Sequence, residues 1–554
     1  HAEQADRGSD TLLLKNTSQP RLGFRVNKIY IDSYYMDPQT QKYPEANREL
    51  MKQFNEGMLV FNYIGHNDPE VGFTGEGLFS RYEMDHLTNT RLPLFITITC
   101  DYCQFDAEDV SAGENVFLNP SAGAIALITT TRVVYTDGND KINRRLMKRL
   151  LERDSNGSPL RIGDVLKLAK RDFNTEIDKN KLNYVLIGDP ALKLAYPEHS
   201  IQVTRINGNS GKKNIEMIPG KNYTVEGEIR SHQNELLSDF NGYIYYNLYD
   251  KEKQFTTLAH QDKKTWTYTH RPDLLTTGKG TIQNGTFRIT VTLPIDNSHS
   301  GKSGLLNLYA YDESGREANG YTDKLIVSTA VEPITEDIQG PDIEFAGIND
   351  DSFTEGILVN NPATFVCKFS DPSGIWSGNS LGKQMTLSLD GACIEENVAR
   401  YYKPIAESEI PEGEFIYPLP RLSNGLHTLT FKVFDTLGNS SEVTIAFEVK
   451  ENSETYTISL EEEPATERAT ISCQDQNGND VTESKHTRIS VTNTLGEEIW
   501  SYETTENNPF PLTWNLQDNN GKRVSAGQYY CKGYFETSAG TIVTPAKKIV
   551  VITQ

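Results

Sequence analysis

Apolar and polar positions divide the chain into two parts that meet near residue 197. In the first part, short apolar runs alternate with stretches whose apolar residues recur every three or four positions. The runs predict strands at 25–31, 57–64, 93–99, 122–129 and 182–187, and the amphipathic stretches predict helices at 44–54, 141–152 and 163–173. Strands that alternate with helices form mostly parallel sheets covered on both faces. Residues 1–197 are therefore predicted to form an α/β domain.

After residue 197 the helical spacing disappears. Short alternating segments recur between turns rich in Gly, Asn and Asp, which is typical of antiparallel β-sandwiches. A strand runs into an Asp-containing, glycine-marked turn at 311–315, 434–438 and 516–521. Because these turns recur at the length of one sandwich, we predict three immunoglobulin-like β-sandwiches, at 198–335, 336–451 and 452–554.

Composition and charge narrow the classes of partner. The net charge of −22 would repel nucleic acid phosphates and anionic lipid, so a polynucleotide is not an expected partner. No apolar run approaches the ~20 residues that a membrane-spanning helix needs. The six cysteines are too few for a disulfide-built scaffold. Cys367 with Cys393, and Cys473 with Cys531, would form disulfides only if the protein is exported and their Cα atoms lie within ~7 Å.

Two sites in the α/β part follow the ends of predicted strands. Residues 57–64 run into Gly65, His66 and Asn67, and residues 93–99 run into Cys100. In open parallel sheets, catalytic groups gather at the carboxyl ends of strands. An imidazole can take the proton of a nearby thiol, the thiolate can attack an acyl carbon, and backbone N–H groups can receive the oxyanion. The pattern is compatible with a Cys–His nucleophilic pair.

Simpler interpretations stay open at this point. A lone His beside a strand is often structural, and a free Cys is often a small buried hydrophobe. Cys100 and Cys103 also form a Cys-x-x-Cys pair, which would suit redox exchange or half a zinc site. No second cysteine pair follows nearby, and the surrounding residues are turn-like, so no metal ligands are assigned.

The order of motifs resembles the gingipain-type cysteine peptidases, and among them the type IX secretion sortases. A strand ending in Gly-His is followed about thirty residues later by a strand ending in Cys. The segments that carry the resemblance further are GAIALITTTR (123–132), RIGD (161–164), NYVLIGDPALKL (183–194), FSDPSGI (369–375), GLHTL (425–429) and WNLQDNNGKRVSAGQY (514–529). The resemblance covers most of the chain.

This resemblance implies a caspase-like α/β fold with Cys100 as nucleophile and His66 as general base. The backbone N–H groups of Cys100 and of Gly65 or Asn67 would form the oxyanion hole. The implied enzyme acts at the outer face of the bacterial outer membrane, as a peripheral protein. It removes the C-terminal signal domain of secreted cargo and joins the new C-terminus to an amine of anionic lipopolysaccharide. An outer-membrane shuttle barrel protein is the implied partner, and no cofactor is required.

The chain departs from the family pattern in two places. Family members carry Gly after the catalytic His, whereas this chain has Asn67, a residue type that tolerates positive φ. The caspase-like sheet also includes a central strand before residue 25, with an acidic loop at its end. We therefore expect an upstream segment of the same protein to supply that strand and an acidic residue that orients His66.

Residues near Cys100 add weaker expectations. Arg132 and Asp101 are candidate pocket residues, and Asp101, Asp106, Glu108 and Asp109 form either a solvated loop or a structural calcium site, because carboxylates suit that cation. Two other functions stay open. One is a secreted gingipain-like endopeptidase without a transfer role, and the other is a catalytically inactive surface adhesin.

Overall fold

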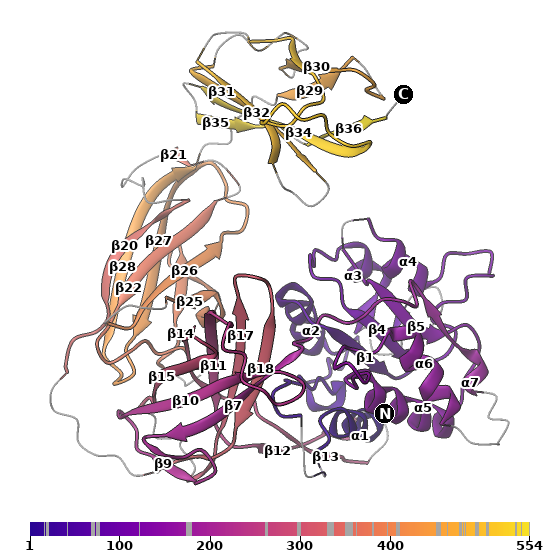
Figure 1. Cartoon of the computed structure of the whole chain (residues 1–554), viewed down its shortest axis with the longest axis vertical. Coiled ribbons are helices and arrows are strands. Elements are labelled where there is room, and N and C mark those ends of the chain that lie inside the picture. Colours follow the sequence, from indigo (N-terminus) through magenta and orange to yellow (C-terminus); the bar gives the residue numbers. More distant parts are fainter. Residues whose placement is uncertain are drawn as a thin grey trace.

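The structure is a computed structural model of the whole chain (Figure 1). It describes residues 1–554 except 16, 18–20, 41, 68–71, 74–77, 121, 173–179, 261–263, 296–300, 330–336, 350–357, 360, 362, 379–381, 396, 406–409, 450–455, 462–463, 476–478, 480, 482–483, 494–497, 506–508, 538–539, 545 and 553–554. The predicted domain boundaries at 335/336 and 451/452 lie outside the described residues or at their edge.

The N-terminal part is built on a four-stranded sheet with the order β1-β4-β5-β6. The strands are β1 (Val60–Ile64), β4 (Leu94–Ile98), β5 (Ala126–Thr130) and β6 (Tyr184–Ile187). The first three are parallel, and β6 is antiparallel to β5. A short hairpin of β2 (Gly72–Phe73) and β3 (Phe79–Ser80) stands apart from this sheet. The mostly parallel sheet agrees with the alternating pattern of the sequence.

Helices cover both faces of this sheet. Their bounds are α1 (Ala2–Leu12), α2 (Pro44–Glu56), α3 (Arg81–Asp85), α4 (Ala112–Leu118), α5 (Thr136–Leu150), α6 (Ile162–Arg171) and α7 (Asn180–Asn183). One hydrophobic core joins the sheet to α5 and α6 through residues such as Ile142 and Val165. A second core joins the opposite face to α2, α3 and α4 through Leu50, Met84 and Val116. Every side chain of β4 and β5 is buried, as expected for central strands.

One prediction for this part is wrong, and one helix was not predicted. Residues 25–30 are extended but pair with no strand, and a short 3₁₀ helix, η1 (Ile31–Ser33), follows them. The side chains of Arg25 and Lys28 contact the first β-sandwich instead, which turns this segment into a connector. Helix α1 was not predicted, because its residues are mostly polar. This helix packs against α5, where Gly8 lies close to Asn143.

Three all-β units follow. The first, called the first sandwich below, differs from the predicted two-sheet form, because its eight-stranded sheet β10-β15-β14-β11-β17-β18-β7-β8 closes on itself through an additional pairing of β10 with β7. The three-stranded sheet β16-β19-β9 and the hairpin β12-β13 accompany it. Its strands are β7 (His199–Ile206), β8 (Asn209–Ser210), β9 (Ile215–Met217), β10 (Asn222–Arg230), β11 (Gly242–Tyr249), β12 (Lys253–Thr256), β13 (Thr267–His270), β14 (Leu274–Gln283), β15 (Thr286–Thr292), β16 (Lys302–Ser303), β17 (Leu305–Asp312), β18 (Glu317–Thr322) and β19 (Leu325–Val327). Alternating strand residues such as Val225, Ile244 and Ile289 fill its core.

The second unit packs a four-stranded sheet, β20-β22-β26-β25, on a five-stranded sheet, β21-β28-β27-β23-β24. Its elements are β20 (Asp342–Ile348), β21 (Leu358–Val359), β22 (Thr364–Ser370), β23 (Thr386–Leu389), β24 (Ala392–Glu395), η2 (Ala399–Tyr401), β25 (Tyr402–Pro404), β26 (Glu412–Pro418), β27 (Gly425–Phe434) and β28 (Ser440–Val449). Residues from both sheets, including Phe365 and Phe431, share one core.

The third unit packs the sheet β29-β30-β33 on a sheet in which β34 lies between β31 and the strands β35 and β36. Its strands are β29 (Thr457–Leu460), β30 (Ala469–Gln474), β31 (His486–Asn493), β32 (Glu498–Thr504), β33 (Leu512–Trp514), β34 (Gly527–Thr537), β35 (Gly540–Val543) and β36 (Lys547–Val551). In Figure 1 this unit lies at the opposite end of the molecule from the first sandwich.

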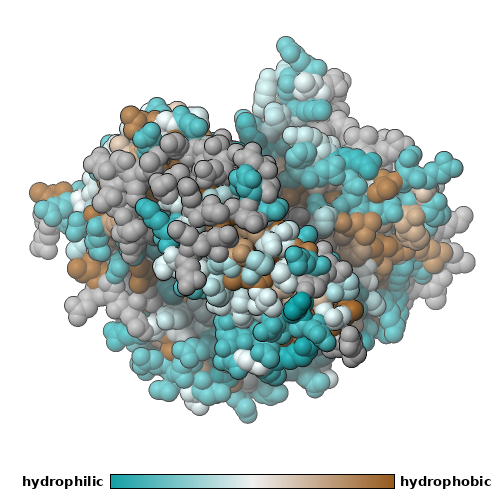
Figure 2. Space-filling model, turned by 90° about the horizontal axis from the view of Figure 1, so that it is seen from above, coloured by the Kyte–Doolittle hydropathy of each residue, from teal (hydrophilic) through white to brown (hydrophobic). Residues whose placement is uncertain are grey.

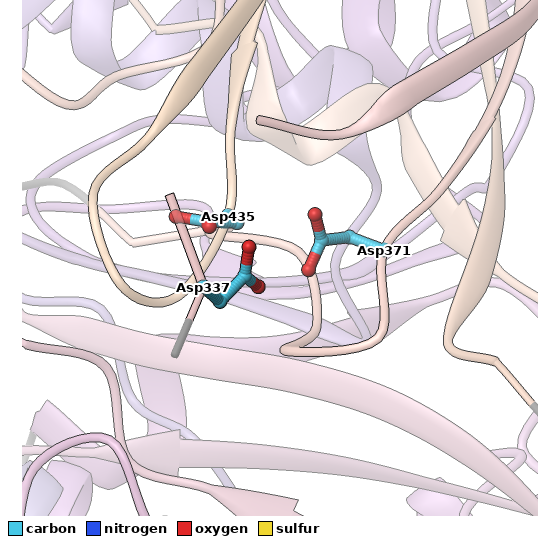
Figure 3. A group of neighbouring side chains, drawn as sticks. All are labelled: Asp337, Asp371 and Asp435. Carbon is cyan, nitrogen blue, oxygen red and sulfur yellow. The ribbon is translucent and has the colours of Figure 1, made fainter. Parts of the chain in front are cut away.

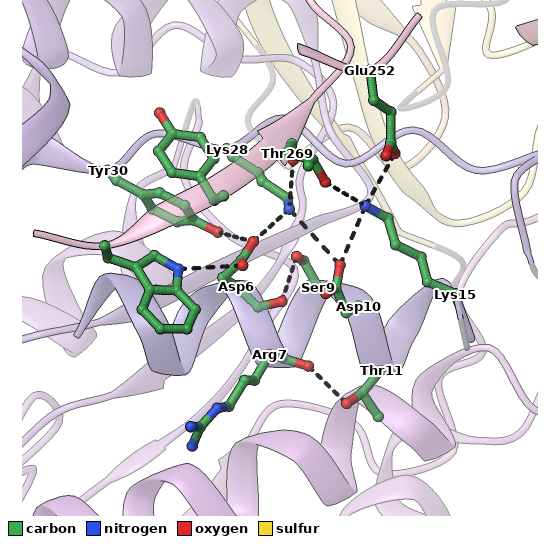
Figure 4. A network of polar contacts seen from close by, with 12 residues as sticks. Asp6, Arg7, Ser9, Asp10, Thr11, Lys15, Lys28, Tyr30, Glu252 and Thr269 are labelled. Carbon is green, nitrogen blue, oxygen red and sulfur yellow. Dashed lines mark hydrogen bonds and ion pairs between the residues drawn. The ribbon is translucent and has the colours of Figure 1, made fainter. Parts of the chain in front are cut away.

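A buried polar network joins α1 to the first sandwich (Figure 4). The carboxylate of Asp6 accepts hydrogen bonds from Lys28 Nζ at 2.5 Å and from the Tyr30 hydroxyl at 3.2 Å. It also accepts one from Trp266 Nε1, beside β13, at 3.3 Å. Lys15 bridges Asp10 on α1 and Glu252, which precedes β12, at 3.3 and 3.1 Å. These contacts fix the position of α1 against the sandwich that follows the α/β part.

No helix in the described part of the chain is long and apolar enough to cross a bilayer. The face seen in Figure 2 is largely hydrophilic, with hydrophobic side chains in small separate groups. Scattered groups of this kind are ordinary on protein surfaces.

Candidate active site

The register of the central sheet brings the two predicted strand ends together. In the parallel pair β1 and β4, Tyr63 lies opposite Thr97 and Ile64 lies opposite Ile98. Continuing this register by two residues sets His66 opposite Cys100. Neighbouring strands lie about 4.8 Å apart, so these two positions are adjacent at the carboxyl edge of the sheet. The prediction that a His and a Cys gather at neighbouring strand ends therefore agrees with the topology.

The loop that carries His66 is held by a side chain from the strand before it. The Tyr63 hydroxyl donates a hydrogen bond of 2.8 Å to the carbonyl oxygen of His66. To reach that oxygen the phenol ring passes over Gly65, where a Cβ atom would collide with the Tyr63 hydroxyl. Glycine at position 65 is thus required by space. It lets the chain turn directly after β1 and present His66 as an exposed side chain.

Asn67 ties this loop to the end of the neighbouring strand. Its Nδ2 donates a hydrogen bond of 3.1 Å to the carbonyl oxygen of Cys100, while its buried Oδ1 has no hydrogen-bond partner among the described residues, which leave out 68–71. The residue that departs from the family pattern therefore contacts the backbone of the predicted nucleophile. Asp101, the next residue, has φ of 48°, a left-handed conformation that side-chain-bearing residues rarely adopt. The chain accordingly turns sharply just after Cys100.

The Cys100 thiol and the His66 ring each contact a group other than one another. The Cys100 thiol donates to the carbonyl oxygen of Val134 at 3.4 Å, and it is half-buried. The His66 ring lies edge-on to the ring of His1, with 3.2 Å between their Nε2 atoms. Within the described residues, no hydrogen bond joins the Cys100 thiol to His66. Catalytic hydrogen bonds are often long before substrate binds, so a side-chain rotation would be needed to bring the pair into contact.

Arg132 and Asp101, the candidate pocket residues, lie beside Cys100 at the same edge. The paired register of β4 and β5 ends at Ile96 opposite Ile128, and Arg132, two residues after β5, is close enough to Asp101 for their charges to interact. The Arg132 guanidinium binds both carboxylate oxygens of Asp106, at 3.0 and 2.5 Å, which lowers the pKa of Asp106. Burial raises the pKa of Asp101, and the charge of Arg132 opposes that shift. Arg132 therefore holds the loop after Cys100 and is already paired with a carboxylate.

Cys103 has a different environment from Cys100. Its side chain is 1% exposed, and the backbone of Gly113, on α4, packs against it. Burial raises the pKa of the Cys103 thiol to about 11. A thiol that is buried and protonated is a poor redox or metal ligand group. These features favour Cys100 as the reactive member of the Cys-x-x-Cys pair.

Carboxylates that approach one another lie elsewhere in the described chain. Asp337, Asp371 and Asp435 place one oxygen each within 4.8 Å of the others, at the edge of the second sandwich (Figure 3). Burial raises the pKa of Asp371 to about 7, and the charges of Asp435 and Asp337 add to that shift. The turn at 434–438, which holds Asp435, was recognised from the sequence, whereas the turn at Asp371 was not. The approach of the two carboxylates has no local sequence signal, because strand pairing sets their distance. The calcium site considered around Asp101 stays a prediction.

A cavity at the junction of the α/β part and the first sandwich lies away from these residues. Its walls include Lys15, Arg25, Lys28 and Arg271 together with apolar side chains. None of the predicted site residues lines it. We place the candidate site at the strand ends because the predicted nucleophile, Cys100, and the predicted base, His66, follow them.

Comparisons with known proteins bear on this assignment. Residues 4–195 match the family model described as peptidase family C25. The chain is similar to a solved structure of dimeric latent PorU from Porphyromonas gingivalis, with 24% identity over 78% of this chain and 41% of that chain and a TM-score of 0.33. It is also similar to the RgpB pro- and mature domains of Porphyromonas gingivalis, with 16% identity over 51% of this chain and 57% of that one and a TM-score of 0.26. The comparison with curated proteins gave no match.

These findings confirm the resemblance to gingipain-type cysteine peptidases for the α/β part. This chain spans about two-fifths of the length of the PorU chain that it matches. The similarities to the β-sandwich modules of other proteins are weak; the fibronectin(III)-like modules of Clostridium thermocellum CbhA, for example, are 10% identical over 37% of this chain and 94% of that chain, with a TM-score of 0.17.

Proposed function

Since residues 4–195 match the gingipain-type cysteine peptidases, we propose that this chain is the catalytic part of a cell-surface sortase for type IX secretion cargo. The observation that supports the peptidase assignment is the parallel pairing of β1 with β4, since His66 and Cys100 each follow the end of one of these strands and Asn67 bonds to the Cys100 carbonyl. The sortase assignment rests on the order of motifs along the chain. The activity, substrates and partners of the whole protein belong to this proposal.

In the proposed reaction, Cys100 attacks the carbonyl carbon of the peptide bond that precedes the cargo signal domain. His66 takes the thiol proton and delivers it to the leaving amine, so that a thioester forms and the signal domain departs. An amine of anionic lipopolysaccharide then attacks the thioester and releases Cys100. Water attacking in its place gives hydrolysis, which is the secreted endopeptidase alternative.

The oxyanion of each step needs hydrogen-bond donors at the strand ends. The backbone N–H groups of Cys100 and of Gly65 or Asn67 are the proposed donors. The hydrogen bond from Asn67 Nδ2 to the Cys100 carbonyl supports this role, because it holds the two backbone segments side by side. The bond from Tyr63 to the His66 carbonyl holds the other side of the same loop.

His1 is the proposed positioning residue for His66. Its Nε2 lies 3.2 Å from Nε2 of His66, and which of the two nitrogens is the donor depends on the tautomer. His1 precedes α1, and α1 is fixed against the first sandwich through Asp6. The first sandwich would thereby help to hold the imidazole in place.

The proposed cellular setting follows from the same resemblance. The protein would be peripheral at the extracellular face of the outer membrane, attached through an outer-membrane shuttle barrel protein that delivers cargo. The sandwiches are the proposed docking modules. An upstream segment of the same protein would complete the catalytic sheet, and no cofactor takes part in the proposed reaction.

The test compares two cysteine variants of the complete protein in a secreting strain. Cys100→Ala removes the proposed nucleophile, and Cys393→Ala removes an exposed cysteine on β24 of the second sandwich. The measurement is the mass of the C-terminal peptide of one cargo protein from each strain. We expect trimmed, lipopolysaccharide-linked cargo from wild type and Cys393→Ala, and cargo that keeps its signal domain from Cys100→Ala.

Other outcomes separate the alternatives. Cargo that is trimmed but not linked in the wild-type strain would favour the endopeptidase. Cargo that is processed identically in all three strains would contradict the role of Cys100 and favour the adhesin.

A further inference from the structure

The third sandwich contains a pair of cysteines on opposing sheets. Cys473 lies on β30, the central strand of one sheet, and Cys531 lies on β34, an interior strand of the other. Both side chains are 0% exposed and belong to the same hydrophobic core. The two thiols are therefore inside one core, each contributed by a different sheet, and they are free in this structure.

The residues around this pair have a recognisable arrangement. Tyr529 precedes Cys531 by two positions on β34, and its hydroxyl donates to the backbone carbonyl of Ser525 at 2.9 Å. The buried Trp514, on β33, packs edge-on against the Tyr529 ring, with 5.6 Å between ring centroids. Immunoglobulin-type sandwiches place a buried Trp and such a tyrosine corner beside a disulfide that links the two sheets.

We propose that Cys473 and Cys531 form an inter-sheet disulfide in the exported protein. The oxidant is a disulfide of the thiol–disulfide exchange class, such as that of an oxidoreductase or of oxidised glutathione. A new S–S bond forms between the two cysteines, and the S–S bond of the oxidant breaks. The two cysteine thiols lose two electrons and two protons, which convert the oxidant into two thiols.

The bond must form before the core closes. Burial raises the pKa of both thiols to about 12, and the proximity of Cys473 adds to the shift of Cys531. Exchange also requires contact with the oxidant, and both side chains are 0% exposed in the folded sandwich, so an external disulfide does not reach them there. We therefore assign the oxidation to the folding of the third sandwich in an oxidising compartment.

The other cysteines of the sandwiches provide a contrast. Cys367 is equally buried, on β22, but Cys393 of the same sandwich is exposed on β24 of the opposite sheet. No single core holds both side chains. The structure thus distinguishes the two pairs that the sequence left equal, and Cys367 serves as a buried control without a facing cysteine.

The test is disulfide mapping of the 554-residue chain exported to a bacterial periplasm. Free thiols are blocked with N-ethylmaleimide in denaturant, and trypsin is added without reductant. We expect peptides 469–485 and 524–532 to be recovered as one cross-linked species that lacks two hydrogen atoms. The peptide that contains Cys367 carries the N-ethylmaleimide label in the same digest. Recovery of both peptides 469–485 and 524–532 with the label would overturn the proposal.

Thermal unfolding gives an independent readout. Reductant should lower the Tm of the exported wild-type chain and of Cys367→Ala, and it should leave the Tm of the double variant Cys473→Ala and Cys531→Ala unchanged. Equal sensitivity to reductant in the double variant and in wild type would contradict the proposal.

Discussion

At the residue scale, the candidate site depends on how two loops are held at the edge of one sheet. Tyr63 binds the carbonyl of His66, and Asn67 binds the carbonyl of Cys100. Tyr63 lies on β1 and Asn67 lies in the loop after it. Their side chains donate to the backbone carbonyl oxygens of His66 and Cys100, respectively. The separation between His66 and Cys100 is therefore set by the backbone of the two loops. Substitutions that displace this backbone, such as a larger residue in place of Gly65, should slow catalysis strongly.

Gly65→Ala tests this dependence. The added Cβ collides with the Tyr63 ring and hydroxyl, so the ring or the loop must move and His66 must move with it. We expect the rate of cargo trimming to fall on the order of 100-fold, because a misplacement of about 1 Å costs that much. The measurement is the trimming rate in the complete protein, with thermal unfolding to show that the fold is intact. A rate equal to that of wild type would show that the loop geometry is not critical.

Tyr63→Phe is the matched variant, because it removes the same hydrogen bond without adding an atom. The loss of one hydrogen bond costs about 1 kcal/mol, so we expect the trimming rate to fall by about tenfold or less. A larger loss in Tyr63→Phe than in Gly65→Ala would mean that the hydroxyl has a role beyond holding the loop.

At the element scale, the helices and strands that were predicted correctly are those whose apolar residues follow the clearest local pattern. Strands β1, β4 and β5 and helix α2 were predictable, since long apolar runs and a clear helical spacing leave few alternatives. Residues 25–31 have the composition of a strand, but their side chains bond to the first sandwich, and composition does not reveal that. Helix α1 is polar along most of its length, and its stability comes from contacts with α5 and the first sandwich.

The turns of the second sandwich lead to a prediction on pH dependence. The pKa of Asp371 is raised from about 3.9 in the unfolded chain to about 7 by burial, with a contribution from Asp435 and Asp337. Between these values the folded state holds a proton that the unfolded state has lost, so stability falls as the pH rises from about 4 to 7. We expect the free energy of unfolding of this sandwich to fall by a few kcal/mol over that window.

Chemical unfolding at pH 5 and pH 8 in a chelator measures this effect. Asp371→Asn should remove most of the pH dependence, because the amide does not titrate. Added calcium should restore stability at pH 8 in wild type only if the three carboxylates bind it. The same pH dependence in wild type and Asp371→Asn would show that Asp371 does not carry the raised pKa.

At the scale of the whole molecule, the α/β part and the first sandwich are joined by the network around α1 (Figure 4). Asp6 receives hydrogen bonds from Lys28, Tyr30 and Trp266, which come from both parts of the chain. The Lys28 side chain is only 4% exposed, and Asp6 is its nearest carboxylate, at 2.5 Å. The position of His1 at the start of α1 links this junction to His66.

Replacement of Asp6 should therefore be costly. We expect Asp6→Ala to lower the free energy of unfolding by about 3 kcal/mol, because Lys28 is left buried beside a weaker partner. Asp10→Ala, on the same helix, removes the ion pair with Lys15 at 3.3 Å and the longer contact with Lys28 at 3.9 Å, and because the Asp10 side chain is 36% exposed and Lys28 keeps Asp6, it should cost less than about 1 kcal/mol. Denaturant unfolding of both variants measures the difference. Equal destabilisation by the two variants would show that the Asp6 network does not hold the junction.

The candidate site itself was predictable only in part. The Gly-His and Thr-Cys strand ends identify His66 and Cys100, because catalytic groups gather at the carboxyl ends of parallel strands. The contacts of Asn67 with the Cys100 carbonyl, of Arg132 with Asp106 and of His1 with His66 join residues 26 to 65 positions apart, and no local pattern encodes them. The sequence likewise named Cys473 and Cys531, but only the sheet pairing puts both in one core.

The rate at which Cys100 is alkylated at neutral pH tests the central claim most directly, since a Cys–His pair raises thiolate reactivity. The measurement follows iodoacetamide labelling of the folded chain by peptide mass, in wild type, His66→Ala and His86→Ala. His86 is an exposed histidine at the end of α3 and serves as the control. We predict that His66→Ala slows labelling of Cys100 by about tenfold or more and that His86→Ala leaves it unchanged. Equal labelling rates in wild type and His66→Ala would contradict the assignment of His66 and Cys100 as a catalytic pair.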